Sequence, residues 1–244
     1  HAPQSLATVE QRVELLGSAG ADAVEVLMFD GAMAAETPEE FVQSVLVDRL
    51  MAKTVVVGEN FLFGAHAAGN VSVLAELGRA HGFDVIAVPL AADNAPWSSS
   101  RIRALLADGE IDEANEMLGR EYSVDGLVVH GDHRGRELGY PTANLQVIGD
   151  PVIPSDGVYA GWLESDGEQM PAAISVGTNP QFEGRERRVE TYVIDRADLD
   201  LYGCSVRVTF AERIRGQEVF ETLDEFIAQM AGDVEQARLL LAGR

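Results

Sequence analysis

The sequence contains one cysteine and one lysine among its 244 residues. The lone cysteine, Cys204, excludes an internal disulfide and a cysteine-rich zinc site, and it makes the cytoplasm the expected compartment. With Lys53 as its only lysine, the chain has no phosphate-binding loop of the form Gly-x-x-x-x-Gly-Lys-Ser/Thr. The motif set of protein kinases is also absent. Any phosphoryl transfer would therefore depend on Mg²⁺, arginine and backbone N–H groups.

Basic residues are scarce throughout the chain. Residues 1–120 hold 7 basic and 18 acidic side chains, residues 121–244 hold 11 and 22, and the net charge is −22. Neither part resembles a nucleic-acid-binding surface, which needs clustered positive charge. No apolar run approaches the roughly 20 residues of a membrane helix. We therefore expect neither nucleic acid nor membrane as a partner.

Residues 1–120 alternate between helical and strand patterns. Capping boxes at Thr8 and Thr37 predict two helix starts, and Asn70 predicts a third. The predicted strands are Ala23–Met28, Lys53–Val57 and Phe83–Val88, and two short helices are expected at Trp97–Ala107 and Ile111–Leu118. This order is typical of an α/β domain with a parallel sheet. Because doubly wound sheets usually have five or more strands, we expect a preceding strand and helix to be missing.

After residue 120 the pattern changes to short β-rich runs that are separated by turns. The predicted strands are Val124–His130, Val158–Leu163, Ala172–Val176, Val189–Ile194 and Val206–Phe210. Their regular spacing predicts a small antiparallel barrel. A capping box at Thr222 then opens a long helix that reaches about Ala242. We therefore expect two domains, at residues 1–120 and 121–244.

The most informative segment is residues 131–145, a loop with glycines at positions 131, 135 and 139 followed by an extended stretch. Pro141 disfavours helix at the residue before it, so the chain should leave the loop extended. In a strand, Thr142 and Asn144 point to the same face and offer two neutral oxygen atoms. Few protein oxygens beside a cationic loop suit a Mg²⁺-nucleotide, because Mg²⁺ takes its other ligands from phosphates and water.

Residues from about 119 to the C-terminus resemble the riboflavin kinase module of bacterial bifunctional riboflavin kinase/FAD synthetases. The matching motifs, in order, are Gly139–Asn144, Pro154–Gly161, Ser175–Pro180, Val189-Glu190 and Leu201–Gly203. The resemblance implies ATP-dependent phosphorylation of riboflavin to FMN, with Thr142 and Asn144 as Mg²⁺ ligands and Glu190 as the general base. A charged strand edge is the alternative reading of Glu190.

The resemblance also assigns the substrate contacts of this module. It implies ATP binding by the loop with Arg134 and Arg136, and flavin binding near a second flap. An ordinary hairpin loop and an exposed pair of arginines are the alternatives. The expected ATP-binding residues are Gly131, Arg134, Gly135, Arg136, Gly139 and Pro141, and the expected flavin-binding residues are Thr178, Asn179, Arg213 and Arg215.

Residues 1–120 resemble the FMN adenylyltransferase module of the same family, which implies a Rossmann-like nucleotidyltransferase fold and conversion of FMN to FAD with ATP. A loop after a predicted strand and a serine-rich helix start carry this resemblance, although serines there could simply cap the helix. The candidate residues are Gly58, Glu59, Asn60, Ser98, Ser99, Ser100 and Arg103. The phosphate-binding histidine motif of the family is absent, since Phe29-Asp30-Gly31 is followed by no histidine. We therefore expect the sequence to start inside this module and to transfer little adenylyl.

Two other functions stay open at this point. The chain could be a flavin- or nucleotide-binding sensor without turnover, or a single-function riboflavin kinase with a structural N-terminal half. The expected cofactor is Mg²⁺, with ATP as co-substrate and FMN and FAD as products. The oligomeric state is not predicted by any pattern in the sequence.

Overall fold

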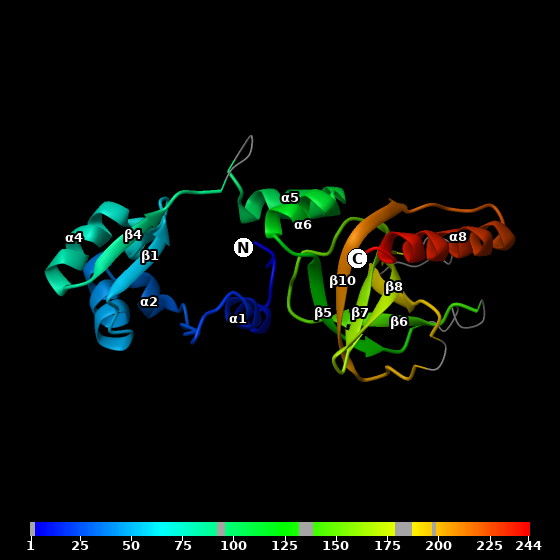
Figure 1. Ribbon diagram of the computed structural model, residues 1–244, viewed down its shortest axis with the longest axis horizontal. Coiled ribbons are helices and arrows are strands. Elements are labelled where there is room, and N and C mark those ends of the chain that lie inside the picture. Colours follow the sequence, from blue (N-terminus) through cyan, green and yellow to red (C-terminus); the bar gives the residue numbers. More distant parts are fainter. Residues whose placement is uncertain (1–2, 92–95, 132–138, 179–186, 197–198) are drawn as a thin grey trace. The chain divides into compact units, whose positions relative to one another are not determined.

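The computed structural model describes residues 3–91, 96–131, 139–178, 187–196 and 199–244. The chain folds into two compact units (Figure 1). One unit combines residues 1–19 with residues 98–244, and the other comprises residues 20–97. The first unit is therefore built from two separate stretches of chain, and the second is inserted between them.

The larger unit contains a closed antiparallel barrel in the strand order β10-β5-β6-β9-β8-β7. The strands are β5 (Tyr122–Val129), β6 (Thr142–Val147), β7 (Gly157–Ser165), β8 (Glu168–Gly177), β9 (Arg188–Val193) and β10 (Ser205–Gly216). Strand β10 changes register against β7 between Phe210 and Glu212 and again between Arg213 and Arg215. Such bulges bend a strand, which helps the sheet to close. The predicted barrel is confirmed.

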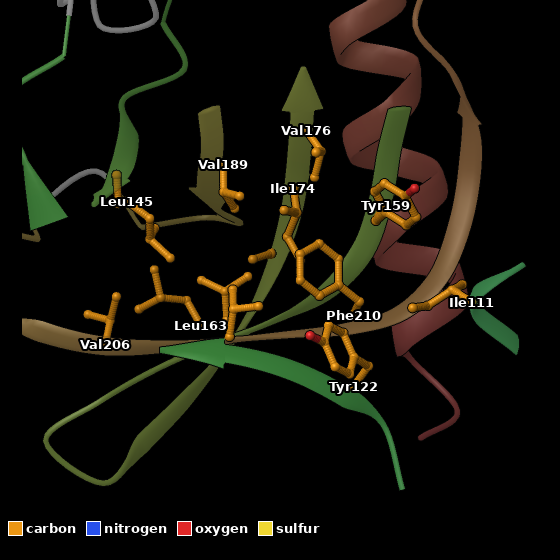
Figure 2. Close-up of a cluster of buried hydrophobic side chains, with 14 of the residues drawn as sticks. Ile111, Tyr122, Leu145, Tyr159, Leu163, Ile174, Val176, Val189, Val206 and Phe210 are labelled. Carbon is orange, nitrogen blue, oxygen red and sulfur yellow. The ribbon is translucent and has the colours of Figure 1, made fainter. Parts of the chain in front are cut away.

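The barrel interior is filled by alternate residues of all six strands. Figure 2 shows Leu145, Leu163, Val176, Val189 and Val206 converging on one another inside the barrel. Tyr122 and Phe210 are fully buried at one end, with ring centroids 6.5 Å apart, and the Tyr122 hydroxyl donates to the Val152 carbonyl at 2.7 Å. Since inward residues alternate with outward ones, Asn144 of β6 and Glu190 of β9 are directed to the outside of the barrel, whereas Thr191 is buried on the inward face.

Helix α8 (Leu223–Leu241) packs along the outer face of β7, β8 and β10 (Figure 1). Thr222 caps it, and Glu225 returns the hydrogen bond to the Thr222 backbone, as the capping box predicts. Ala237 and Leu241 on its apolar side pack in a small cluster with residues of the barrel. The barrel residues of this cluster are Ala160, Ala173, Ile194 and Ala211.

Helices α5 (Ser99–Asp108) and α6 (Ile111–Leu118) form a hairpin that packs on the barrel. Asn115 fixes this contact, because its side chain donates to the Phe210 carbonyl and accepts from the Tyr122 N–H at 2.7 Å. The compact units therefore do not coincide with the expected domains 1–120 and 121–244. The difference arises because Ile102, Leu106 and other apolar residues of the hairpin join the barrel core.

The segment before residue 20 also belongs to the barrel unit. Helix α1 (Val9–Ser18) begins at a complete capping box on Thr8. Before it, Ser5 forms a parallel bridge with Pro151, and the Gln4 side chain donates to Asp150 at 3.0 Å. Within the described ranges, every helix is too short or too polar to cross a lipid bilayer.

The smaller unit has a parallel pair of strands, β1 (Thr54–Gly58) and β4 (Asp84–Val88), and a small hairpin of β2 (Leu62–Phe63) and β3 (Gly69–Asn70). Apolar residues on one face of this strand pair pack against a buried core of Val42, Phe63, Leu74 and Phe83. The helices are α2 (Gly31–Ala35), α3 (Pro38–Phe41) and α4 (Val71–His81), with the π-helix η1 (Val42–Arg49) and the 3₁₀ turn η2 (Ala65–Ala67).

The prediction of a strand at Ala23–Met28 is wrong. These residues form no ladder, and Val26 and Met28 are exposed at 55% and 81%. A short apolar run becomes a strand only when another strand lies beside it, which a local pattern does not reveal. The parallel α/β character of this unit is confirmed by the pairing of β1 with β4.

Candidate functional site

The register of β6 against β9 brings the predicted metal ligands and the predicted base together. Asn144 lies directly opposite Glu190 in the ladder, and Thr142 lies opposite Tyr192. Side chains of directly opposed residues share a face of the sheet, so all four point outward from the barrel. Glu190 follows Asn144 and Thr142 by 46 and 48 positions in the sequence, and the pairing of the two strands brings these residues close together.

A cavity opens on this outer face, between the barrel and helix α8. It encloses about 770 Å³ of empty space, part of it open to solvent. Thr142 and Glu190 both line it. The strand residues of its wall also include Val158, Ala173, Ile174, Ser175, Tyr192 and Arg215, and the remaining wall is formed by Tyr140, Gln217, Glu218, Phe220, Phe226, Met230, Asp233 and Val234.

Within the part of the chain that the structure describes, the side-chain oxygen of Asn144 is buried and unpaired, as expected of an atom that binds an ion or a substrate. Its side chain is only 8% exposed, and its Oδ1 has no hydrogen-bond partner among the described residues. A buried acceptor without a partner carries a free-energy cost unless a ligand or ion satisfies it. Gly131 presses against this amide, since an ideal Cβ there would lie 2.7 Å from Asn144 Oδ1. The glycine at the start of the predicted phosphate loop thus leaves room for the asparagine.

Two aromatic rings lie at the same cavity. Tyr140 and Tyr192 meet edge to face with centroids 5.3 Å apart. Burial raises the pKa of the Tyr192 phenol, and the carboxylate of Asp195 raises it further. The Tyr192 phenol is therefore neutral near pH 7 and offers a hydrogen-bonding group without charge.

The two arginines predicted for the flavin have different environments. Arg215 lines the cavity and forms a bidentate ion pair with Asp233. Arg213 instead donates to the carbonyls of Asp108 at 3.2 Å and Asp156 at 3.1 Å, and it does not line the cavity. The register shift between Arg213 and Arg215 accompanies this difference. Arg213 thereby ties the turn after α5 to the loop before β7.

The other predicted kinase residues fall into two groups. Thr178 follows β8, half-buried, and is not part of the cavity lining, while Gly139 has a left-handed backbone with φ of 88° and Pro141 directly precedes β6. The remaining predictions, for Arg134, Gly135, Arg136 and Asn179, lie outside the described residues.

The predicted adenylyltransferase residues belong to both compact units, each of which is described by itself. In the smaller unit, Gly58 ends β1, and Glu59 accepts from the Leu90 N–H at 3.2 Å and donates its own N–H to the Val88 carbonyl. These bonds join the loops at the carboxyl ends of two parallel strands, where α/β sheets place ligands. Asn60 is exposed in the same turn.

In the barrel unit, Ser98 caps helix α5 by accepting from the Arg101 N–H at 3.2 Å. Ser99 and Ser100 form the exposed first turn. Arg103 donates from Nε to the Gln4 carbonyl at 2.6 Å, so it holds the N-terminal segment. The capping role of the serine run is thus present, and it leaves the N–H groups of the first turn available to an anion.

Asp233 is the main cavity residue that the sequence patterns did not single out. It is 4% exposed and comes from α8, 18 positions after its partner Arg215. One signal was present: Asp233 lies three residues after Met230 and four before Ala237, on the apolar stripe of the predicted helix. A carboxylate at such a position needs a buried partner.

Comparison with known protein families assigns both parts of the chain. The riboflavin kinase model matches residues 118–241. The FAD synthetase model matches residues 1–101.

Individual relatives agree with this assignment. The bifunctional riboflavin kinase/FMN adenylyltransferase of Escherichia coli K12 is 35% identical over 239 residues, which is 97% of this chain and 76% of the relative. The protein of the same description from Listeria monocytogenes is 31% identical and covers 97% of this chain and 75% of its own length. A crystal structure of a Streptococcus pneumoniae protein described as a macrolide-efflux protein aligns with a TM-score of 0.86 and 33% identity, over 96% of this chain and 76% of that one. The chain belongs to the bifunctional riboflavin kinase/FMN adenylyltransferase family.

Proposed function

We propose that the barrel unit transfers the γ-phosphate of ATP to the 5′-hydroxyl of riboflavin and releases FMN and ADP. The observation that carries this proposal is the cross-strand pairing of Asn144 with Glu190, together with the place of Glu190 and Thr142 in the wall of one cavity. The family-model match to riboflavin kinases over residues 118–241 supports the same reaction. A sensor without turnover would not need a carboxylate at that position.

The proposed roles follow from the chemistry of each side chain. Glu190 accepts the proton of the riboflavin hydroxyl as its oxygen attacks the γ-phosphorus, and the bond to the ADP oxygen breaks. Thr142 Oγ1 and Asn144 Oδ1 would hold Mg²⁺, because both are neutral oxygen donors and the latter is buried without a partner. Bound there, the ion would neutralise charge on the phosphate oxygens.

The apolar and aromatic part of the cavity suits the flavin ring system. Val158, Phe226 and Met230 provide apolar surface, and Tyr192 provides an aromatic face next to Glu190. The ATP contacts are proposed for Gly131, Gly139 and Pro141 together with the arginines of the intervening loop. Thr178 and Arg213 are retained as flavin contacts only by resemblance to the family, whereas Arg215 is also supported by its place in the wall.

The second activity of the family is adenylylation of FMN to FAD, and we propose it for residues 1–120 with the site residues named above. It is supported by the FAD synthetase match over residues 1–101. We expect FMN to be the main product of this sequence, because the phosphate-binding histidine motif of the family is not among its residues. Consumption of ATP, which cells keep inside, supports the cytoplasmic location expected from the sequence.

The reaction is tested by incubating the protein with riboflavin and Mg²⁺-ATP and separating the flavins by chromatography. FMN should accumulate, and folded protein that yields no FMN would refute the kinase assignment. In the variant Glu190→Gln, FMN formation should fall by roughly 10²-fold or more, as expected for loss of a general base. Riboflavin binding, followed by quenching of flavin fluorescence, should persist in that variant, while unchanged turnover would remove Glu190 from the role of base.

A further inference from the structure

The cavity wall contains an ion pair that joins the end of β10 to helix α8. Arg215 donates from Nε to Asp233 Oδ1 at 2.9 Å and from Nη2 to Oδ2 at 2.7 Å. The two side chains are 16% and 6% exposed, the lowest values of any ion pair between described residues. An ion pair so poorly hydrated is costly to assemble, because both charged groups lose water.

The carboxylate of Asp233 is fully engaged by protein groups. Besides Arg215, it accepts from Gln229 Nε2 at 2.9 Å. Both carboxylate oxygens thus accept from protein donors and have little capacity left for a substrate. Asp233 therefore affects a bound molecule through the group that it holds.

The guanidinium of Arg215 retains donors for a ligand. It has five N–H groups. Nε and one N–H of Nη2 go to Asp233, one N–H of Nη1 goes to the Gly216 carbonyl at 2.9 Å, and the Phe220 ring lies 5.7 Å from the guanidinium carbon. One N–H on each of Nη1 and Nη2 is left, and Arg215 borders the cavity.

We infer that Asp233 is a positioning residue for riboflavin that acts through Arg215. The side-on ion pair fixes the plane of the guanidinium, so that its remaining N–H groups serve the carbonyl oxygens of a flavin ring. It also cancels the positive charge of Arg215. The wall then suits a neutral heteroaromatic ring with acceptors on its edge, and it lacks the free cation that would attract a nucleotide phosphate. This inference rests on riboflavin being the occupant of the cavity.

The test uses Asp233→Asn, which keeps the shape of the side chain and removes its charge. We expect the Kd of riboflavin, from flavin fluorescence quenching, and its KM to rise about tenfold or more, the equivalent of one charge-assisted hydrogen bond. The KM of ATP and kcat should stay near the wild-type values, because Thr142 and Glu190 are untouched.

A matched control exists on the same helix. Arg238 of α8 pairs with Asp195, at the end of β9, with Nη2 2.9 Å from Oδ1, and neither residue lines the cavity. Asp195→Asn therefore loosens α8 from the barrel without altering Arg215. It should bind riboflavin like the wild type. An equal loss of affinity in both variants would overturn the inference, because it would show that α8 needs only to be attached.

A second comparison separates action through Arg215 from any independent effect. If Asp233 acts through Arg215, the double variant Arg215→Met/Asp233→Leu should bind riboflavin about as well as Arg215→Met alone. This double variant should fold even if Asp233→Asn does not, because it leaves no unpaired charge in the interior. Additive losses, or folded Asp233→Asn with wild-type riboflavin affinity, would overturn the positioning role. Wild-type protein that binds no riboflavin and makes no FMN would instead refute the proposed function.

Discussion

Replacing Gly131 with alanine would place a methyl group against the side chain of Asn144. An ideal Cβ at position 131 lies 2.5 Å from Asn144 Cγ and 2.7 Å from Oδ1. Carbon atoms in contact need about 3.5 Å, so the amide must move by about 1 Å. The backbone of Gly131 is not in the left-handed region, and the colliding group is a side-chain end. The fold should therefore survive while Asn144 leaves its position opposite Glu190.

The expected effect is on catalysis and not on stability. Displacing a substrate-positioning group by about 1 Å costs on the order of 10²-fold in rate. We expect FMN formation at fixed Mg²⁺-ATP to fall by about that factor, with partial recovery at high Mg²⁺. Riboflavin affinity and the thermal midpoint of unfolding should be close to those of the wild type.

A double-variant cycle decides whether the glycine acts through the asparagine. In the background Asn144→Ala, the added methyl group has nothing to displace, so Gly131→Ala should cause little further loss. The assay is initial-rate FMN formation across a Mg²⁺ titration for the four proteins. Full, multiplicative losses would refute the reasoning, as would a wild-type rate in Gly131→Ala alone.

Two further predictions concern the barrel. Asn115→Ala removes the side-chain hydrogen bonds to the Phe210 and Ala211 carbonyls and to the Tyr122 N–H. The free energy of unfolding, measured with denaturant, should therefore fall by about 2–3 kcal/mol. A change near zero would contradict the role of α6 as a fixed part of this unit. Burial raises the pKa of Tyr122 above that of the unfolded phenol, so the contribution of Tyr122 to stability should be constant below about pH 10 and decline as the pH rises further, because the unfolded chain ionises first. In Tyr122→Phe this decline should be smaller, and an unchanged slope would exclude Tyr122 as its source.

Local signals in the sequence predicted most elements of the structure. The capping boxes at Thr8, Thr37 and Thr222 are all present, and each strand predicted after residue 120 is observed in the barrel. Such features succeed because they depend on residues that are neighbours in the chain or along one strand.

The features that were missed depend on distant partners. The apolar run 23–28 lacks a neighbouring strand, and the α5–α6 hairpin packs on the barrel through Asn115 and apolar core residues. Arg213 and Arg215 look alike in sequence, yet a register shift in β10 separates their environments. The contacts of the two arginines are made with Asp108, Asp156 and Asp233, which no local sequence pattern links to them.

Residues 20–97 are inserted into the barrel unit. Synthesis of the barrel unit therefore begins before that of the inserted unit, but the barrel unit can be completed only after it. Gln4 and Asp150, which bond to each other, are 146 positions apart. At ribosomal rates they emerge on the order of ten seconds apart. The inserted unit can therefore fold on the nascent chain while the segment before it still lacks its partner, so this segment is synthesised before the inserted unit and docks after it.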